Sequence, residues 1–426
     1  MSAKNNVTID LRTTDHIKSF GHSMYPILHN GDIIYYKKTP YQKIKLNDII
    51  ISQKNNLYVT HRVIYKTSDY IITKGDNNLE IDEPLLPESI IGVVNKVQRG
   101  KVTFIPETYY LLQSSIYYQH IHSVIKEMER HTISYVLLKG LPLHLKYHQE
   151  HPRKGFFDFD ILISPTDRDV LMKILNDLGF KRRYDFLSPT HERLMNKSIE
   201  ETCMKKFEGF NIAVDIHYEA VFMMTQIGTL NPLYHQSYID GFTKELFNNT
   251  VTFQEHDLKC QLLTDEYLFV YLSLHFFHHN FKSLHRLNLI AALIQSIPRA
   301  KRHGFWKSVF SIIHKYRLQG YIYGTFISLE KYLPATSIPQ WFLNKIRPGK
   351  AQCNYLKNYF LTEHIYEEYN ATRAGILLFT HLYILSYNPW YKKILVFLQP
   401  AVIFMMVWLV YYYVTTRCKK LLRTFL

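Results

Sequence analysis

Short runs of β-branched and aromatic residues recur through the first 105 residues, and each run is bounded by Gly, Asn or Asp. Runs of this kind are typical of β-strands that are separated by turns. Strands are therefore expected at 32–36, 48–51, 58–63, 70–73, 91–97 and 102–105. The pattern predicts a β-rich domain over residues 1–105, which ends before Pro106.

A different pattern follows. A helical connector is expected over 106–131, and between 132 and 260 expected strands alternate with helices, which is typical of an α/β domain. The strands are expected at 134–138, 157–164 and 210–218, and a helix at 167–178. From 261 to 393 apolar residues recur at helical spacing, for example over 265–296, so a helical region is expected there.

No charged residue occurs between 394 and 416, a length that spans a bilayer core. Lysines precede this segment and a basic tail, 417–426, follows it, so it predicts a transmembrane helix with lipid contacts. The alternative is a buried core helix. The polar first 12 residues contain no secretory signal. We therefore expect a membrane protein with a C-terminal anchor and cytoplasmic catalytic domains.

The net charge of +15 favours an acidic partner: nucleic acid, anionic lipid or a phosphate-bearing substrate. The basic residues are scattered without the arginine-aromatic pattern of nucleic-acid modules, so nucleic acid is the least favoured of the three. The four cysteines are far apart and form no Cys-x-x-Cys pair. A disulfide framework or a structural zinc site is therefore not expected.

Three short segments in the β-rich part carry the residue types of a serine nucleophile site. Ser23 lies in the segment 21–26, His61 in 60–63, and Asp76 in 74–78, with Asp82 a few residues later. A serine hydroxyl needs a base to act as a nucleophile, and a carboxylate orients that base. The alternative is a surface turn together with a solvated strand histidine.

These segments, in this order, resemble the motifs of type I signal peptidases of the archaeal and endoplasmic-reticulum kind, over roughly residues 18–105. The resemblance implies that Ser23 is the nucleophile, His61 the general base and Asp82 the residue that orients it, with Asp76 in support. It further implies a serine endopeptidase that needs no cofactor and cleaves a signal or leader peptide from a peptide or preprotein.

The second candidate site is acidic. Asp158 and Asp160 point to the same face of the expected strand, where two carboxylates can bind Mg²⁺ between nucleotide phosphates. Asp215, in the later strand, adds a third carboxylate. The alternative is a set of acids on a solvated sheet face. Histidines at 275, 278, 279 and 285 have no acidic or thiol partner, so packed or solvent-facing side chains are expected.

Lys139-Gly140, Arg153, the acidic strand and the segment 214–218 together resemble the uncharacterised nucleotidyltransferase family of the polymerase-β-like superfamily, over roughly 130–300. The resemblance implies that Asp158, Asp160 and Asp215 bind Mg²⁺ and that Lys139, Gly140 and Arg153 approach the phosphates of a nucleoside triphosphate. The superfamily usually has Gly-Ser where this chain has Lys139-Gly140.

The chain is therefore expected to be multidomain, with a β-rich signal-peptidase-like domain, an α/β nucleotidyltransferase-like domain with a helical C-terminal part, and a transmembrane helix. The main functional interpretation is a serine endopeptidase fused to a nucleotidyltransferase-like domain. One alternative is a cytosolic, metal-dependent nucleotidyltransferase with an accessory leader-peptide-processing domain. The other is a non-catalytic protein that binds peptide and nucleotide.

Overall fold

The computed structural model describes residues 15–54, 57–78, 80–147, 158–183, 200–220, 230–255, 257–365, 371–399, 402–403 and 407. The chain forms two compact units. Unit 1 comprises Met1–Gln119, His151–Phe157 and Lys206–Ile212, and unit 2 comprises His120–Glu150, Asp158–Lys205 and Ala213–Leu426. The second and third segments of unit 1 interrupt unit 2 along the sequence.

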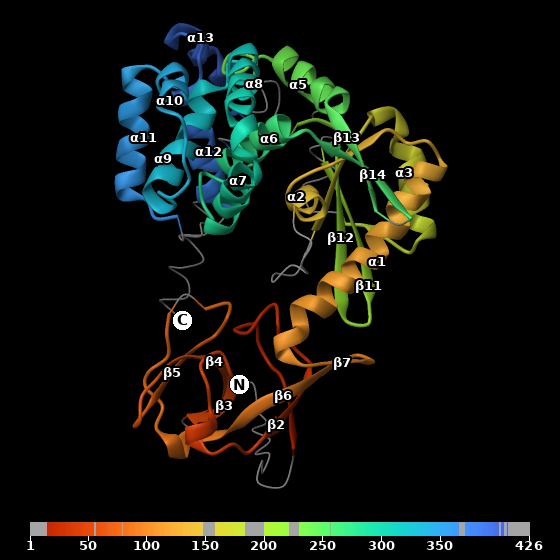
Figure 1. Cartoon of the computed structure of the whole chain (residues 1–426), viewed down its shortest axis with the longest axis vertical. Coiled ribbons are helices and arrows are strands. Elements are labelled where there is room, and N and C mark those ends of the chain that lie inside the picture. The colour runs from red at the N-terminus through yellow and green to blue at the C-terminus, as the bar shows by residue number, and fades with distance from the viewer. Residues whose placement is uncertain are drawn as a thin grey trace. The chain divides into compact units, whose positions relative to one another are not determined.

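Unit 1 is built on an antiparallel sheet in the order β1-β2-β6-β3-β4-β5, with β7 paired to β6 (Figure 1). Each long strand presents branched apolar side chains to the interior, including Ile50, Val63 and Ile71. Its strands are β1 (His16–Lys18), β2 (Ile33–Lys37), β3 (Ile49–Lys54), β4 (Leu57–Lys66), β5 (Ile71–Lys74), β6 (Ile90–Arg99) and β7 (Val102–Phe104). Its 3₁₀ helices are η1 (Tyr41–Lys43), η2 (Pro87–Ser89) and η3 (Pro106–Thr108).

A buried ion pair links two segments of unit 1 that are far apart in the sequence. The Arg99 guanidinium donates to Asp32 through Nε (3.0 Å to Oδ1) and Nη2 (2.8 Å to Oδ2), and both side chains are 3% exposed. The same guanidinium lies over the rings of Phe104, Tyr109 and Phe210. The pair therefore connects the turn before β2 to the end of β6 and to the turn at 208–209, which precedes Phe210.

Unit 2 contains a mixed sheet in the order β10-β11-β12-β9-β8-β14-β13. The pairs β12/β9 and β14/β8 are parallel, whereas β8/β9, β10/β11 and β13/β14 are antiparallel. The strands are β8 (Tyr135–Leu137), β9 (Asp158–Ile163), β10 (Lys181–Arg182), β11 (Glu200–Phe207), β12 (Phe210–His217), β13 (Thr250–Glu255) and β14 (Leu258–Leu263).

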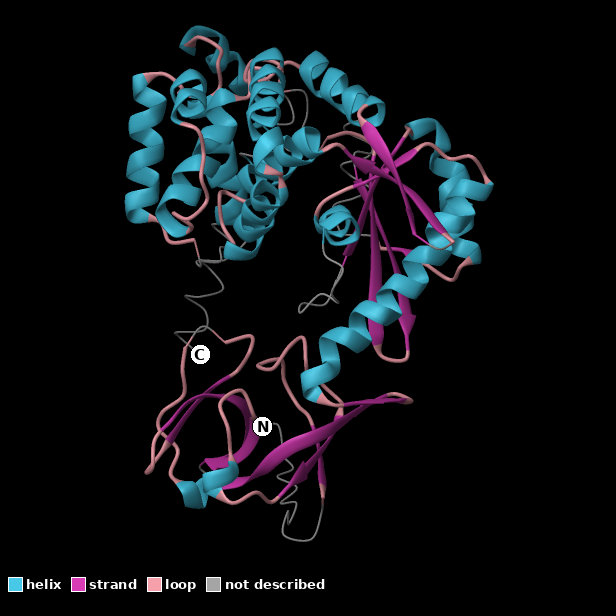
Figure 2. Ribbon diagram, in the orientation of Figure 1, coloured by secondary structure: helices cyan, strands magenta, loops and turns pink. Residues whose placement is uncertain are grey.

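Helices make up the C-terminal part of unit 2 (Figure 2). The central one is α6, which is apolar around its whole circumference and packs against α7, α8 and α9. The helices are α1 (Tyr109–Arg130, which begins in unit 1), α2 (Gly140–Tyr147), α3 (Arg168–Asp177), α5 (Gln236–Asn248), α6 (Asp265–His278), α7 (Leu284–Ser296), α8 (Arg302–Lys315), α9 (Gln319–Tyr332), α10 (Gln340–Ile346), α11 (Lys350–Thr362), α12 (Ala371–Leu385) and α13 (Trp390–Ile394). The 3₁₀ helices of unit 2 are η4 (Pro165–Asp167), η6 (Arg299–Lys301) and η7 (Leu395–Leu398).

The prediction of a transmembrane helix at 394–416, and with it a membrane location through a C-terminal anchor, is wrong for the described part of the chain. Within that part no helix has both the length and the apolar character that a membrane span needs. Helix α13 ends at Ile394, η7 follows, and Gln399 is extended, the conformation favoured before a proline such as Pro400. Residues 400–401, 404–406 and 408–426 lie outside the described residues.

We expect Arg99→Met to destabilise unit 1 by about 3–5 kcal/mol, because it leaves the buried Asp32 carboxylate without its counter-charge. Hydrogen exchange of the β2 and β6 amides, followed by mass spectrometry, measures the effect. The control is Lys54→Met, which removes an exposed ion pair to Glu83 (2.7 Å) and should change little. Equal protection of β2 and β6 in both variants would contradict the structural role of Arg99.

Candidate active site

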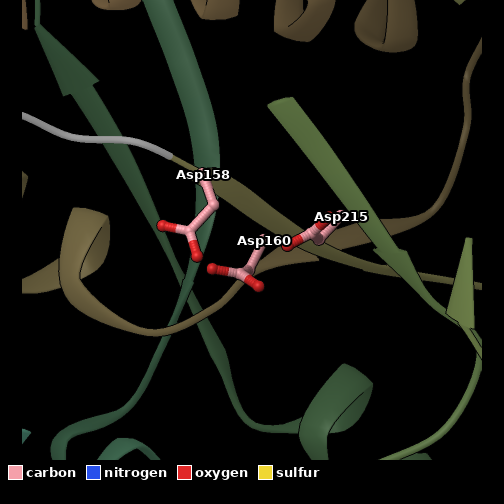
Figure 3. A group of neighbouring side chains, drawn as sticks. All are labelled: Asp158, Asp160 and Asp215. Carbon is pink, nitrogen blue, oxygen red and sulfur yellow. The ribbon is translucent and has the colours of Figure 1, made fainter. Parts of the chain in front are cut away.

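Three carboxylates come together on two neighbouring parallel strands of unit 2. Asp158 and Asp160 alternate along β9 and so share a face, and Asp215 on β12 lies directly opposite Asp160 in the strand register. One carboxylate oxygen from each of the three lies within 4.8 Å of the others. Figure 3 shows the side chains of Asp158 and Asp160 extending toward each other from β9. The structure thus brings together all three predicted metal ligands.

Asp160 is the buried member of this acidic group, with 4% exposure. Its Oδ1 receives two donors: the Lys139 ammonium, with which it forms an ion pair, and His217 Nε2 at 3.1 Å. Asp160 therefore has two protein donors, and among the described residues it is the one member of the acidic group that is paired with an ammonium.

The charges of the group act on one another. Burial would raise the pKa of Asp160, but the Lys139 ammonium and the His217 hydrogen bond hold it below its ordinary value. Asp158 reaches solvent at the start of β9, yet surrounding atoms displace much of its water. That desolvation, with the charge of Asp160, raises the pKa of Asp158 to about 6. Burial and Asp160 likewise raise the pKa of Asp215, which accepts a 2.7 Å hydrogen bond from Thr202.

Lys139 stays a predicted contact of the nucleotide phosphates, and the structure pairs its ammonium with Asp160. Lys139 follows β8 with a φ of +61°, a left-handed conformation that is unfavourable for a residue with a Cβ atom. Although burial would lower the pKa of Lys139, the Asp160 carboxylate raises it above its ordinary value. Gly140 begins α2, and the space where its Cβ would lie is 3.6 Å from Leu289. Arg153 lies outside the described residues.

Two residues near the acidic group were not singled out from the sequence. His217 lies two positions after Asp215 and therefore on the same face of β12, a period-two signal that was readable in the sequence. Its Nδ1 is buried and has no hydrogen-bond partner among the described residues. Thr202 has no such signal, because its contact with Asp215 depends on β11 lying beside β12.

The histidines at the C-terminal end of α6 pack against one another. His275 and His279, one helical turn apart, place their Nε2 atoms 3.1 Å from each other. Burial, together with neighbouring cationic groups that include Lys139, lowers the pKa of His278 to about 4 and that of His279 to about 2. These imidazoles are therefore neutral near pH 7.

The three residues predicted for the serine site also come together, in unit 1. His61 on β4 places Nδ1 2.6 Å from Oδ2 of Asp82 and Nε2 3.0 Å from Oγ of Ser23. An ionised carboxylate only accepts, so Nδ1 carries the proton and Nε2 accepts from the Ser23 hydroxyl. Thr73 donates a second hydrogen bond to Asp82, 2.6 Å from the same oxygen.

The Asp76 side chain contacts the residue next to His61 in the chain. Its carboxylate accepts two hydrogen bonds of 2.8 Å from the guanidinium of Arg62. Beside it, Gly75 leaves no room for a side chain, because a Cβ atom would lie 2.6 Å from the Ser23 carbonyl oxygen. The Asn77 amide donates to that same oxygen (2.8 Å). The loop 75–77 therefore holds the turn that contains Ser23.

Comparison with known proteins identifies unit 2. The family model described as "Uncharacterised nucleotidyltransferase" matches residues 110–334, which is more than half of the 426 residues. No curated protein matches the chain. Among solved structures, the lincosamide antibiotic adenylyltransferase LnuA, bound to lincomycin, is 14% identical with a TM-score of 0.27, over 42% of this chain and 97% of that one. A likeness this slight says nothing of substrate.

The prediction that this protein is a serine endopeptidase of the signal-peptidase kind is wrong, because the family match is to nucleotidyltransferases. The comparisons give no support to a separate signal-peptidase domain, which also corrects the expected fold class. Three short motifs place a serine, a histidine and an aspartate in hydrogen-bonding order, but such a trio recurs on unrelated folds and does not define an enzyme class. The peptide or preprotein substrate was inferred from the serine endopeptidase class, so it is not supported either.

The raised pKa of Asp158 predicts that divalent-cation binding weakens in acid. Below pH of about 6 this carboxyl is protonated, so a cation must displace the proton. We expect the affinity for Mn²⁺ to be level above pH 7 and to fall by up to about tenfold per unit below 6. Isothermal titration calorimetry with Mn²⁺ at pH 5 to 8, in two buffers of different ionisation enthalpy, measures both the affinity and the number of protons released. A Mn²⁺ affinity that is constant from pH 5 to 8 would contradict the assignment of Asp158 as a metal ligand.

Proposed function

The chain belongs to the uncharacterised nucleotidyltransferase family, and from that premise we propose that it transfers a nucleotidyl group from a nucleoside triphosphate at the carboxylates of Asp158, Asp160 and Asp215. The observation that carries this proposal is the convergence of the three carboxylates on two parallel strands, with ligand atoms within 4.8 Å of one another. In such a reaction the acceptor oxygen attacks the α-phosphorus, the bond to the β-phosphate breaks, and pyrophosphate leaves.

The composition of the group fits Mg²⁺. All three ligands are carboxylate oxygens, the donors that hard divalent cations prefer, and no thiol or imidazole belongs to the group among the described residues. A cation bound there would neutralise negative charge on the phosphates during transfer. The partners implied by this site are a nucleoside triphosphate and a divalent cation.

The remaining residues position these groups. His217 holds Oδ1 of Asp160, and Thr202 donates to Asp215, so two of the three carboxylates have a fixed orientation. Gly140 begins α2, where free backbone amides favour an anion, and we place the nucleotide phosphates near Lys139 and Gly140. Arg153 keeps its proposed role as a third phosphate contact.

We expect the Asp158→Asn/Asp160→Asn double variant to lose metal-dependent nucleotide binding. Even substitutions outside the ligand shell lower metal affinity by about 10- to 100-fold, so the loss of two ligands should weaken ATP or CTP binding by at least about a hundredfold. Isothermal titration calorimetry, with and without Mg²⁺, measures it.

The matched control removes the same number of negative charges at positions outside the acidic group. Asp169→Asn/Asp177→Asn alters two exposed carboxylates on α3 and should bind nucleotide as the wild type does. Binding that survives the first double variant, or the absence of binding for every nucleoside triphosphate tested, would exclude the proposed transferase activity.

A second candidate rests on a separate observation, the hydrogen-bond chain from Asp82 through His61 to Ser23. We propose that these residues make Ser23 an activated nucleophile, since His61 is placed to accept the hydroxyl proton as the oxygen attacks. No peptide substrate is assigned to this serine. The chain of contacts supports reactivity and not a particular substrate.

Reaction with a fluorophosphonate probe tests this second candidate. The Ser23 oxygen would bond to phosphorus, fluoride would leave, and His61 would take the proton. We expect the wild type to be labelled, and Ser23→Ala and His61→Ala to lose labelling by about a hundredfold or more. Ser89→Ala, in the half-buried η2, should be labelled like the wild type. Equal labelling of wild type and Ser23→Ala would show that Ser23 is an ordinary serine.

A further inference from the structure

Contact with the nucleotide phosphates does not explain why the Lys139 ammonium forms an ion pair with Asp160, one of the proposed metal ligands. Among the described residues, Lys139 carries the one ammonium or guanidinium that forms an ion pair with any of the three carboxylates. Its side chain is 18% exposed and that of Asp160 is 3% exposed, so this ion pair is largely out of water. A charge pair in such surroundings acts strongly on other charges nearby.

The acidic group carries more negative than positive charge. Three carboxylates face one ammonium, and in the described part of the chain neither Asp158 nor Asp215 has a cationic side chain paired to it. A divalent cation would be attracted by the carboxylates and repelled by the Lys139 ammonium. Lys139 and a bound cation would therefore each neutralise part of the negative charge of the same carboxylates.

Asp160 has two protein partners at this site. The Lys139 ammonium forms an ion pair with it, and His217 Nε2 donates to its Oδ1 at 3.1 Å. The His217 hydrogen bond would therefore remain as a contact to the carboxylate if the ammonium left. The left-handed backbone at Lys139 and the helix that starts at Gly140 hold the lysine at the edge of the site.

We propose that Lys139 is an internal counter-cation, which stands in for the divalent cation in the metal-free site and is displaced from Asp160 when the cation binds. This role rests on the proposed function, because the same carboxylates must bind the cation. It differs from a lysine that only contacts phosphate, since such a lysine would leave the affinity for the metal alone unchanged. It differs also from a structural ion pair, whose loss no metal would compensate.

The test is Mn²⁺ binding to the full-length protein without nucleotide, followed by electron paramagnetic resonance of the free ion. We expect Lys139→Gln, which keeps a donor but removes the charge, to bind Mn²⁺ about tenfold more tightly than the wild type. Lys139→Arg keeps the charge and should resemble the wild type. His217→Ala, which removes the other donor to Oδ1, should change the affinity in the opposite direction.

The matched control lies on the neighbouring helix. Lys146 on α2 pairs with Asp265 at 2.6 Å, so Lys146→Gln removes a comparable ion pair outside the acidic group and should leave Mn²⁺ affinity unchanged. Thermal unfolding gives a second readout. Metal-free Lys139→Gln should melt below the wild type, and saturating Mn²⁺ should raise its Tm by more than it raises that of the wild type. Mn²⁺ should not reverse the decrease in Tm that Lys146→Gln causes relative to the wild type.

An affinity of Lys139→Gln equal to or weaker than that of the wild type would overturn the counter-cation role. If at the same time the wild type binds Mn²⁺ and Asp158→Asn/Asp160→Asn does not, the proposed transferase site stands and only the role of Lys139 fails. If neither the wild type nor Lys139→Gln binds Mn²⁺, the carboxylates bind no divalent cation and both proposals fail.

Discussion

The buried carboxylate of Asp160 is the constraint around which unit 2 is arranged. A charge that is 4% exposed is expensive to bury unless other groups compensate it. The compensation comes from elements far apart in the sequence: Lys139 after β8 and His217 on β12, which pairs in parallel with β9. Lys139 and His217 are far apart in the sequence, and both reach Asp160 because β9 lies between β8 and β12 in the sheet.

Much of the acidic site follows from the sequence because it depends on local periodicity. Alternation along a strand places Asp158 beside Asp160, and the same rule places His217 beside Asp215. The ion pair of Lys139 depends instead on which strands become neighbours, and no local pattern encodes that. The sequence therefore indicates which side chains share a face, whereas their partners come from the tertiary structure.

The helical region shows the same limit. Apolar spacing over 265–296 predicts helix throughout, yet α6 ends at His278 and α7 begins at Leu284. Between them Asn280, Phe281 and Ser283 have positive φ angles, which residues with side chains seldom adopt and which no composition rule signals. The apolar segment after Lys393 has the composition of a membrane span. In the described part it forms the 3₁₀ helix η7, in which Val396 is buried and the other residues are exposed, and it is helical again at 402–403. Hydropathy alone does not distinguish such a segment from a membrane span.

The two candidate sites differ in how their chemistry relates to family. In unit 1, Ser23, His61 and Asp82 have the hydrogen-bond order of a nucleophile and its base, while the family match concerns nucleotidyl transfer. In unit 2, the family match and the three converging carboxylates both fit the proposed nucleotidyl transfer, yet the ammonium of Lys139 is paired with one of the carboxylates proposed to bind the divalent cation. The positive charge of Lys139 lowers the electrostatic repulsion among the three carboxylates when no cation is bound. The same charge makes cation binding an exchange rather than a simple addition, so the affinity for the metal reflects the difference between two ways of compensating Asp160.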